Sequence, residues 1–333
     1  HTEGVAHGPS TLFMHTGAIN QVRPSVGSWV TYGLGTMNQN LPGFVTLQPS
    51  ASKGGPRNYA SAFLPAVHQG TAVGRAGMRA RDAKIRYTTS VQDAARQKKQ
   101  FAFLQKMNRT QAARAGAGDE LEAAIESFEL AYRMQMNAPS VLDISGESKQ
   151  TQAMYGIGQK PTDDFGRQCL MARRLCEAGV RYVQVNYSDE SNTPRWDQHS
   201  NMPKHMTHAR ATDLPVAGLI QDLKQRGLLE DTLIWWGGEF GRTPFAQGKN
   251  GRDHNPRGFT VFLAGGGIKP GIAYGATDEL GDTAVEGKVH MHDLHATLLH
   301  LLGLDHLKLT YRYAGRDFRL TDVAGEVVHP IIA

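Results

Sequence analysis

The stretch from Asp231 to Phe259 begins Asp231-Thr-Leu-Ile-Trp-Trp-Gly-Gly-Glu239-Phe-Gly-Arg242-Thr-Pro and, after a polar loop, continues Gly251-Arg-Asp-His-Asn-Pro. The apolar run over residues 232–236 is typical of a strand that is buried on both faces. Two glycines end this run, and a carboxylate, Glu239, follows directly. Because ligands collect at the carboxyl ends of strands in open α/β sheets, this turn is a candidate site.

Strand-like and helix-like runs alternate on both sides of this stretch. Apolar, β-rich runs cover residues 42–47, 180–187 and 258–264. Helical spacing of apolar residues covers 163–179, 206–227 and 293–302. The alternation predicts an α/β fold with a central, mostly parallel or mixed sheet and helices on both faces.

The N-terminal part gives weaker signals. We expect a helix to start near Ser25, whose side chain could cap it, because Val26, Trp29 and Val30 supply an apolar side. Residues 1–22 are expected to be irregular, since glycines and threonines are scattered among three histidines.

An inserted helical hairpin is expected over about 89–137. Apolar residues recur there at helical spacing in two stretches separated by Ala115-Gly-Ala-Gly, and Pro139 is expected to end the pair. Between Arg75 and Arg114, eleven Lys or Arg residues stand against two acids. This excess could bind an acidic polymer, with a solvated helix face as the alternative, and the few aromatic residues argue against nucleic acid.

Size and composition are those of an ordinary globular protein. The chain has 333 residues, of which 40% are hydrophobic and 20% charged, and its formal net charge is +5. No run approaches the roughly 18 apolar residues of a membrane helix, and no secretory leader is visible at His1. Cys169 and Cys176 lie in one predicted helix about 10 Å apart, which is too far for a disulfide.

Acidic and imidazole side chains gather where predicted strands end and where the last helix begins. Ten of the fourteen histidines follow residue 198. Carboxylate oxygens and imidazole nitrogens from several such segments suit one or two divalent metal ions. The predicted metal ligands are Asp197, His199, Glu239, Asp253, His254 and His292.

Two other groups of residues are interpreted differently. His295, His300 and His306 are expected to be partly buried histidines with ordinary hydrogen bonds, because an apolar helix surrounds or precedes them. Arg242 offers a guanidinium fork to an anionic ester, with Arg252 or Arg195 as second choices. Taken alone, the Asp253-His254 pair could instead belong to a capped loop with surface charges, and the metal site is then not needed to explain it.

Six motifs spread over nearly the whole chain resemble one family. The motifs are Arg23-Pro-Ser-Val-Gly-Ser-Trp, Trp196-Asp-Gln-His, Gly238-Glu-Phe-Gly-Arg-Thr-Pro, Gly251-Arg-Asp-His-Asn-Pro, His292-Asp-Leu-His-Ala-Thr-Leu-Leu-His-Leu-Leu-Gly and Gly315-Arg-Asp-Phe-Arg-Leu-Thr-Asp. The chain resembles the bacterial sulfatase-like family called domain of unknown function 1501, within the alkaline phosphatase superfamily. The resemblance implies a single domain over residues 1–333, an alkaline phosphatase-like α/β/α sandwich and a metal-dependent, hydrolase-like pocket.

The resemblance also bears on individual residues. Glu239 stands where relatives with known chemistry carry the Asp of a Ser/Thr-Asp-His-Gly turn, and Phe240 replaces the His of that turn. His254 is expected to supply the imidazole instead. In the superfamily the nucleophile and one metal-binding Asp follow the first strand, and family members resemble one another there in a Gly-Gly-Pro-Ser motif followed by Asp.

That motif has only a partial counterpart here. Gly8-Pro-Ser lacks both the preceding strand and the following Asp, and the chain starts at His1 rather than Met. We therefore expect a native N-terminal segment to be absent from this chain. Full family members resemble exported proteins, often with a twin-arginine leader, which implies an extracytoplasmic location, periplasmic or secreted.

The function expected from these observations is metal-dependent hydrolysis of sulfate or phosphate esters, on a small molecule or a polysaccharide. Zinc is the first expectation for the metal, and calcium or magnesium are alternatives. The competing hypothesis is a non-catalytic protein of the same fold that binds acidic polysaccharide or serves in cell-surface assembly. Neither nucleic-acid binding nor a transmembrane segment is expected.

Overall fold

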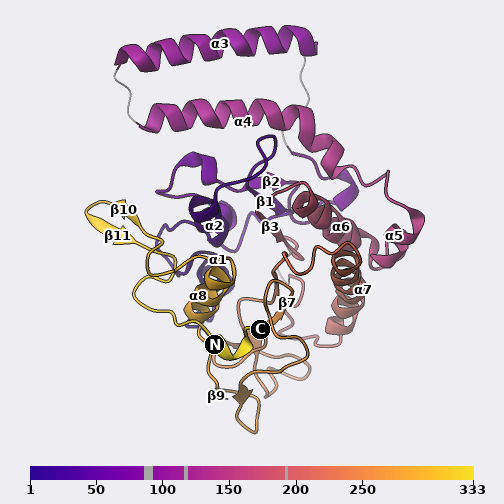
Figure 1. Ribbon diagram of the computed structural model, residues 1–333. Helices are drawn as coiled ribbons and strands as arrows, with labels where there is room; N and C mark the ends of the chain where they lie inside the picture. Colours follow the sequence, from indigo (N-terminus) through magenta and orange to yellow (C-terminus); the bar gives the residue numbers. More distant parts are fainter. Residues whose placement is uncertain (86–92, 116–118, 192–193) are drawn as a thin grey trace.

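The computed structural model describes residues 1–85, 93–115, 119–191 and 194–333, and it confirms a mixed α/β fold. Figure 1 shows α1 and α8 on one side of the central strands and α6 and α7 on the other. The helices are α1 (His7–Thr16), α2 (Val26–Leu34), α3 (Ala94–Ala115), α4 (Asp119–Leu142), α5 (Lys149–Met154), α6 (Asp163–Glu177), α7 (Lys204–Gln225) and α8 (Met291–Leu301). The strands are β1 (Phe44–Leu47), β2 (Thr71–Val73), β3 (Tyr182–Val185), β4 (Ile234–Trp236), β5 (Gly241–Arg242), β6 (His254–Asn255), β7 (Phe262–Ala264), β8 (Ala276–Thr277), β9 (Ala284–Glu286), β10 (Tyr311–Tyr313) and β11 (Arg316–Phe318).

The best-buried sheet is parallel and has three strands in the order β2-β1-β3. All four residues of β1 are buried, which is why its sequence is apolar apart from Thr46. The amphipathic helix α6 packs on this sheet through Phe165, Leu170 and Leu175, all less than 5% exposed. Each such side chain stabilises the fold by about 1.5–3 kcal/mol through the apolar surface it removes from water.

The single central sheet that the sequence predicts is divided in the structure. Among the described residues, β4 pairs only with β7, and this pairing is antiparallel. The expectation that residues 232–236 form a strand buried on both faces is also wrong, because Trp236 at its end is 41% exposed. The remaining strands form the antiparallel pairs β5-β6, β8-β9 and β10-β11.

The N-terminal residues contain a helix, so the prediction of an irregular segment over 1–22 is wrong. α1 buries Leu12 and Phe13, and it ends at Gly17, which adopts a left-handed backbone with φ of 67°. The sequence hides this helix because Gly8 and Pro9 suggest a turn, yet both fall in the first turn, where a proline costs no hydrogen bond. Packing against α8 supplies the missing stability: His295 donates from Nε2 to the carbonyl oxygen of Met14 at 2.8 Å.

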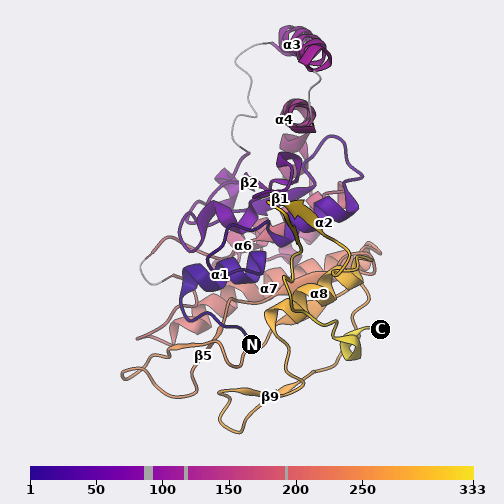
Figure 2. The ribbon, with the colours of Figure 1, turned by 90° about the vertical axis from the view of Figure 1, so that its left-hand side faces the viewer.

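The hairpin of α3 and α4 projects from the body of the molecule, as Figures 1 and 2 show. This agrees with the predicted helical insertion, although its predicted start near residue 89 and its break at 116–118 lie outside the described residues. Pro139 does not end α4, which continues to Leu142. The extra turn persists because Ala138, only 1% exposed, packs in the core together with Val141 and Leu142.

Other predictions from the sequence have clear outcomes. Ser25 precedes α2, but its hydroxyl contacts Ser28 and the carbonyl oxygen of Ala60 rather than a helical N–H. Cys169 and Cys176 are both free thiols, as their spacing predicts. Of the helices in the described part of the chain, none has the length and apolar character needed to cross a membrane.

Two buried histidines should make the protein sensitive to acid. Burial lowers the pKa of His295 to about 3 and that of His15 to about 4. Both stay neutral in the folded state while the unfolded chain takes up protons below about pH 6.5, so stability falls as pH falls through this window. Lowering the pH from 7 to 5 should reduce the free energy of unfolding by about 2 kcal/mol for each of these two histidines.

Urea unfolding at several pH values measures this effect. His295→Gln, which keeps a donor for the Met14 carbonyl, should show a shallower loss of stability toward pH 5 than the parent. His329→Gln, at an exposed position, should leave the dependence of the unfolding free energy on pH unchanged. Equal slopes in the parent and His295→Gln would contradict the expectation.

Candidate metal centre

Three imidazoles converge on one buried carboxylate. Nε2 of His199 lies 2.9 Å from Oδ1 of Asp197, and Nε2 of His254 lies 3.3 Å from the same oxygen. Nε2 of His7 lies 3.0 Å from Oδ2 of Asp197. One ligand atom from each of these four residues lies within 4.8 Å of the corresponding atoms of the others.

The loops that carry these residues are fixed against one another. Asp197 and His199 lie in the loop after β3, and His254 lies in β6, which pairs with β5. The N–H of Arg252 donates to the carbonyl of Gln198, joining the two loops. Gly251 permits this approach, because a Cβ at its position would lie 1.7 Å from the carbonyl oxygen of His199.

Each histidine is anchored through its other ring nitrogen. Nδ1 of His7 contacts Oε1 of Glu239 at 2.5 Å, and Nδ1 of His199 contacts Oε1 of Gln247 at 2.5 Å. Nδ1 of His254 contacts the carbonyl oxygen of Val5 at 2.6 Å. Because a carbonyl or carboxylate oxygen only accepts, each neutral ring carries its hydrogen on Nδ1. The lone pair of each Nε2 is therefore directed toward the cluster, as in metal-binding histidines.

The four residues of the cluster could hold a metal ion, and imidazole nitrogens and a carboxylate oxygen are donors that zinc accepts. Around a tetrahedral ion with bonds of about 2.0–2.1 Å, neighbouring ligand atoms lie about 3.3 Å apart. Nε2 of His199 lies 3.0 Å from Nε2 of His254, so this pair needs to move apart by only a few tenths of an ångström, and all four ligand atoms lie within 4.8 Å of one another. Nε2 of His7 is buried and lies 3.0 Å from Oδ2 of Asp197, a spacing that two ligand atoms of one ion can have.

Charges around the cluster are closely balanced. Burial alone would raise the pKa of Asp197, but the hydrogen bond from Arg242 at 2.8 Å and the charge of His7 hold that pKa at about 2. Burial likewise opposes protonation of His7, yet its contacts with Glu239 and Asp197 raise its pKa above the ordinary value. The carboxylates are thus ionised, and a proton on His7 competes with a cation for the same site.

The structure brings together some of the residues predicted as ligands and separates others. Asp197, His199 and His254 are in the cluster, and Glu239 reaches it through His7. Asp253 lies at the rim, with Oδ1 3.7 Å from Nδ1 of His199 and a side chain that is 54% exposed.

His292 lies elsewhere, so its prediction as a ligand of this centre does not fit the structure. Its Nε2 donates to the carbonyl oxygen of Gly17 at 2.9 Å, beneath α1. The neighbouring acid is also occupied, because Asp293 accepts the N–H of His290 and caps α8. His295 and His306 make ordinary hydrogen bonds, as expected for histidines of a packed core.

The three candidate arginines have different surroundings. Arg242 touches the cluster through Asp197, and its side chain is 16% exposed. Arg252 instead donates to the carbonyl of its neighbour Gly251, and Arg195 lies over the ring of Tyr187 at 4.3 Å. Of the three, Arg242 is therefore the best placed to meet a ligand of the cluster.

His7 is the cluster residue that sequence reasoning missed. It lies 190 positions before Asp197 and in a segment predicted to be irregular, so spacing could not connect it to the other residues. Its neighbours Gly8 and Pro9 drew attention only as a partial motif. Three histidines, His1, His7 and His15, lie close together in the sequence near its start and could have indicated a site. The residues around them do not show which of the three reaches it.

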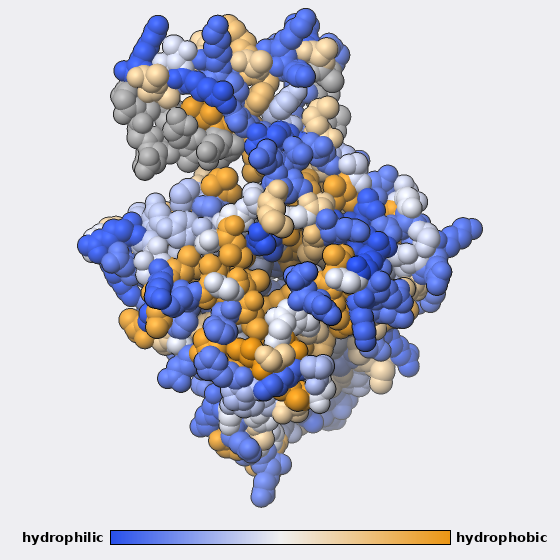
Figure 3. Space-filling view, in the orientation of Figure 1, coloured by the Kyte–Doolittle hydropathy of each residue, from blue (hydrophilic) through white to orange (hydrophobic). Residues whose placement is uncertain are grey.

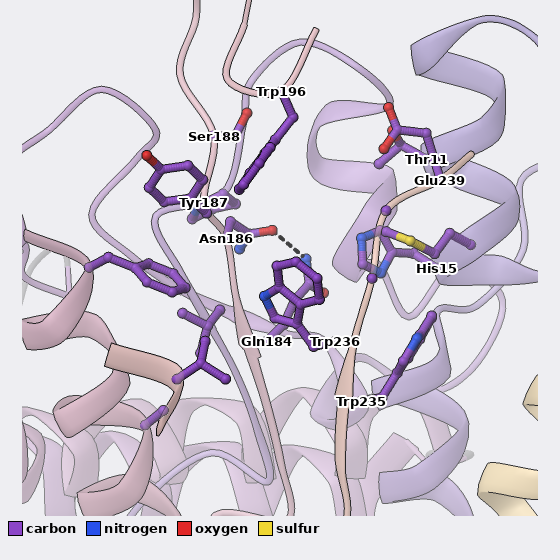
Figure 4. A pocket seen from close by; sticks show the side chains of 18 of the residues that line it. Thr11, His15, Gln184, Asn186, Tyr187, Ser188, Trp196, Trp235, Trp236 and Glu239 are labelled. Carbon is purple, nitrogen blue, oxygen red and sulfur yellow. Dashed lines mark hydrogen bonds between the residues drawn. The ribbon is translucent and has the colours of Figure 1, made fainter. Parts of the chain in front are cut away.

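A cavity of about 500 Å³ opens beside the cluster. His7, Asp197, Glu239 and Arg242 line one part of it. Figure 4 shows the remainder, where Trp235, Trp236 and Tyr187 lie near Gln184, which donates to Asn186 at 3.0 Å. The candidate centre therefore borders a space with both polar and aromatic walls.

Residues 1–332 match the family model described as "Protein of unknown function (DUF1501)", and the chain belongs to this family. No curated protein matches the chain. No solved structure matches it either.

Zinc binding tests the centre directly. The purified protein should retain about one zinc ion per chain, and Asp197→Asn should lose most of it, because the substitution removes the only carboxylate among the four cluster residues. Glu239→Gln should weaken zinc binding by about 10–100-fold, since it perturbs the anchor of His7. Metal analysis after dialysis and calorimetric titration measure both changes.

Asp253→Asn is the matched control, because this exposed carboxylate at the rim should leave zinc affinity nearly unchanged. Equal zinc content in the parent and Asp197→Asn, whether high or absent, would rule out this assignment of ligands.

Proposed function

We propose that this protein is a metal-dependent hydrolase of sulfate or phosphate esters. The observation that supports it most is the set of three histidines, each anchored at Nδ1, whose Nε2 atoms meet Asp197 beside Arg242 at a cavity. The resemblance of the motifs to sulfatase-like proteins of the alkaline phosphatase superfamily, and to their α/β/α sandwich, agrees with this proposal.

His7, Asp197, His199 and His254 would hold the metal, for which zinc suits three imidazoles and one carboxylate. When bound, zinc would lower the pKa of a bound water and withdraw charge from the ester. Hydrolysis adds water to the sulfur or phosphorus atom and breaks its bond to the alcohol oxygen, which leaves with a proton. The extracytoplasmic location implied by the resemblance belongs to the same proposal.

Arg242 would recognise the anionic group. Its guanidinium has Nη2 fixed on Oδ1 of Asp197 at 2.8 Å, so its remaining donors are held at the cluster. A positioned guanidinium binds sulfate or phosphate oxygens and favours the charge that develops on them during transfer. Glu239 would orient His7 rather than contact the ester.

Turnover of aryl sulfates and aryl phosphates tests the reaction. With zinc supplied, Arg242→Lys should lower kcat/KM about 100-fold or more, because lysine cannot keep both the contact with Asp197 and a contact with the anion. Zinc content should be largely retained, which separates loss of chemistry from loss of the metal.

Arg257→Lys provides the control, since Arg257 is exposed and pairs with Asp282 away from the cluster. Zinc-loaded protein that hydrolyses neither class of ester would reject the proposed reaction while leaving the metal centre intact.

A second candidate function is binding of an acidic polysaccharide by the hairpin. Within α3 there is no acidic residue, and its basic side chains are exposed. Arg96, Lys99, Lys106 and Arg114 recur at intervals that place them on the side of α3 opposite the buried Gln105 and Ala112. This arrangement presents positive charge away from α4.

Binding to dextran sulfate should therefore depend on salt and on this face. The double change Lys99→Glu with Lys106→Glu should weaken binding about 10-fold or more in 50 mM salt, and 500 mM salt should weaken binding by the parent. The same charge changes at Lys204 and Lys224, both exposed on α7, are the control. Equal losses from both double variants would show only a general effect of net charge.

A further inference from the structure

The helix α3 leaves most of its larger apolar side chains exposed. It has 22 residues, yet among its described side chains only Gln105 and Ala112 are buried. Leu104 is 54% exposed, and Phe103 and Met107 are exposed as well. A helix in a folded protein is stabilised mainly by burial of its apolar side rather than by its own sequence. The apolar residues of α3 therefore lack the cover that a helix of this length normally has.

One contact between the two helices shows which residues share a side of the hairpin. Nε2 of Gln97 donates to Oε1 of Gln135 at 2.6 Å. Seven residues make nearly two full turns of an α-helix, so residues seven apart lie on nearly the same side. Leu104 follows Gln97 by seven positions, and Phe128, which is 62% exposed, precedes Gln135 by seven. Exposed apolar residues of both helices therefore lie on the side that the glutamine pair marks.

The opposite side of the hairpin carries ion pairs. Nη2 of Arg109 donates to Oε1 of Glu129 at 2.6 Å, and Nη1 of Arg133 lies 3.7 Å from the other oxygen of this carboxylate. Arg109 follows Leu104 by five positions, which turns it about 140° around the helix axis. Figure 3 shows hydrophilic residues over much of the visible side of the hairpin, at the top of the molecule. Water can solvate the charged side, whereas the apolar side gains from being covered.

We propose that the apolar side of the hairpin binds the same side of a second copy of this chain, with α3 of each copy against α4 of the other. In sequence, α3 has six Lys or Arg residues and no acid, whereas α4 has five acids and one arginine. A two-fold axis parallel to the helices places each helix against its oppositely charged counterpart. An axis across the helices would place basic α3 against basic α3, and an anionic membrane would attract α3 but repel α4.

The same axis brings the exposed apolar side chains together. The rings of Phe101 and Tyr132 stack with 4.3 Å between their centroids, which fixes the register of α3 on α4. Phe128 precedes Tyr132 by four positions, so it lies at the level reached four positions after Phe101, between Leu104 and Met107. Rotation about an axis parallel to the helices keeps each residue at its level. Leu104 and Met107 of one copy therefore meet Phe128 of the second copy.

The hairpin is large enough for a stable contact and is free to make it. With 22 and 24 residues, α3 and α4 are about 33 and 36 Å long. Two adjacent helices, each about 10 Å in diameter, present a side of roughly 650 Å², so two copies bury about 1,300 Å² in total. Specific interfaces bury about 1,200–2,000 Å². Figures 1 and 2 show the hairpin projecting from the body, so this axis places the two bodies on opposite sides of a four-helix bundle.

Analytical ultracentrifugation of the 333-residue chain measures the association. The parent should form a dimer of twice the 36.4 kDa of one chain at about 100 µM, a concentration that populates dimers with a micromolar Kd. Leu104→Glu should weaken association about 10-fold or more, because each dimer would bury two unpaired carboxylates. Met136→Glu is the matched control and should leave association unchanged, since Met136 is 56% exposed and follows Glu129 by seven positions, on the charged side.

A mixture of two variants tests the pairing of α3 with α4. Phe128→Lys alone should also weaken self-association about 10-fold or more. An equimolar mixture of Leu104→Glu and Phe128→Lys should form dimers more readily than either variant alone. In a mixed dimer, one of the two contacts joins the new carboxylate to the new ammonium group, and the other keeps the parent residues. Circular dichroism should show the helix content of the parent in every variant.

Three results would each overturn the proposal: a parent that stays monomeric, an equal loss of association in Met136→Glu, or no gain on mixing the two variants. A monomeric parent that floats with phosphatidylserine vesicles would assign the hairpin to a membrane surface instead. Self-association needs neither zinc nor turnover, so it can succeed or fail independently of the proposed hydrolysis.

Discussion

The candidate centre depends on hydrogen bonds made by the histidine nitrogens that face away from it. Glu239, Gln247 and the Val5 carbonyl each hold one Nδ1 atom, which fixes the tautomer and the direction of the ring. Without these contacts an imidazole can rotate and present a hydrogen instead of a lone pair. The acceptors come from three separate parts of the chain, so the arrangement is a property of the folded protein and not of any local motif. Asp197 is then the point on which the oriented nitrogens meet.

Asp197 is also the centre of the local charge balance. A buried carboxylate is costly unless it is paired, and this one has Arg242 and three imidazoles within 3.3 Å. In the absence of a cation, Arg242 supplies an opposing charge, and the contacts of His7 with Glu239 and Asp197 favour its protonation by raising its pKa. A cation that replaces the proton on His7 would leave Arg242 in place, so the site could exchange one positive charge for another with little rearrangement. Uptake of metal would then release a proton, as is general for histidine sites.

The sequence predicts those parts of the structure whose stability is local or strongly periodic. The buried strand β1 and the amphipathic helix α6 follow directly from apolar spacing, and Asp197, His199 and His254 stand out because they lie close to predicted strands. The failures have a common cause. α1 is stabilised by contacts with α8 rather than by its own residues, and Pro139 remains helical because the turn beyond it is buried. His292, which the sequence predicts as a ligand, binds the backbone of Gly17, and His7, for which the sequence predicts no role, reaches the loops. The packing of α1 on α8 decides both positions, and neither segment alone reveals it.

The packing of α1 on α8 has a consequence for biosynthesis. His7 and Glu239 are 232 positions apart, and the contact between His292 and Gly17 closes a loop of 275 positions. α1 therefore cannot complete its packing until α8 has been synthesised. Until then His7 and His292 lack contacts that they make in the folded protein, and the four-residue cluster cannot form before His254 has been translated.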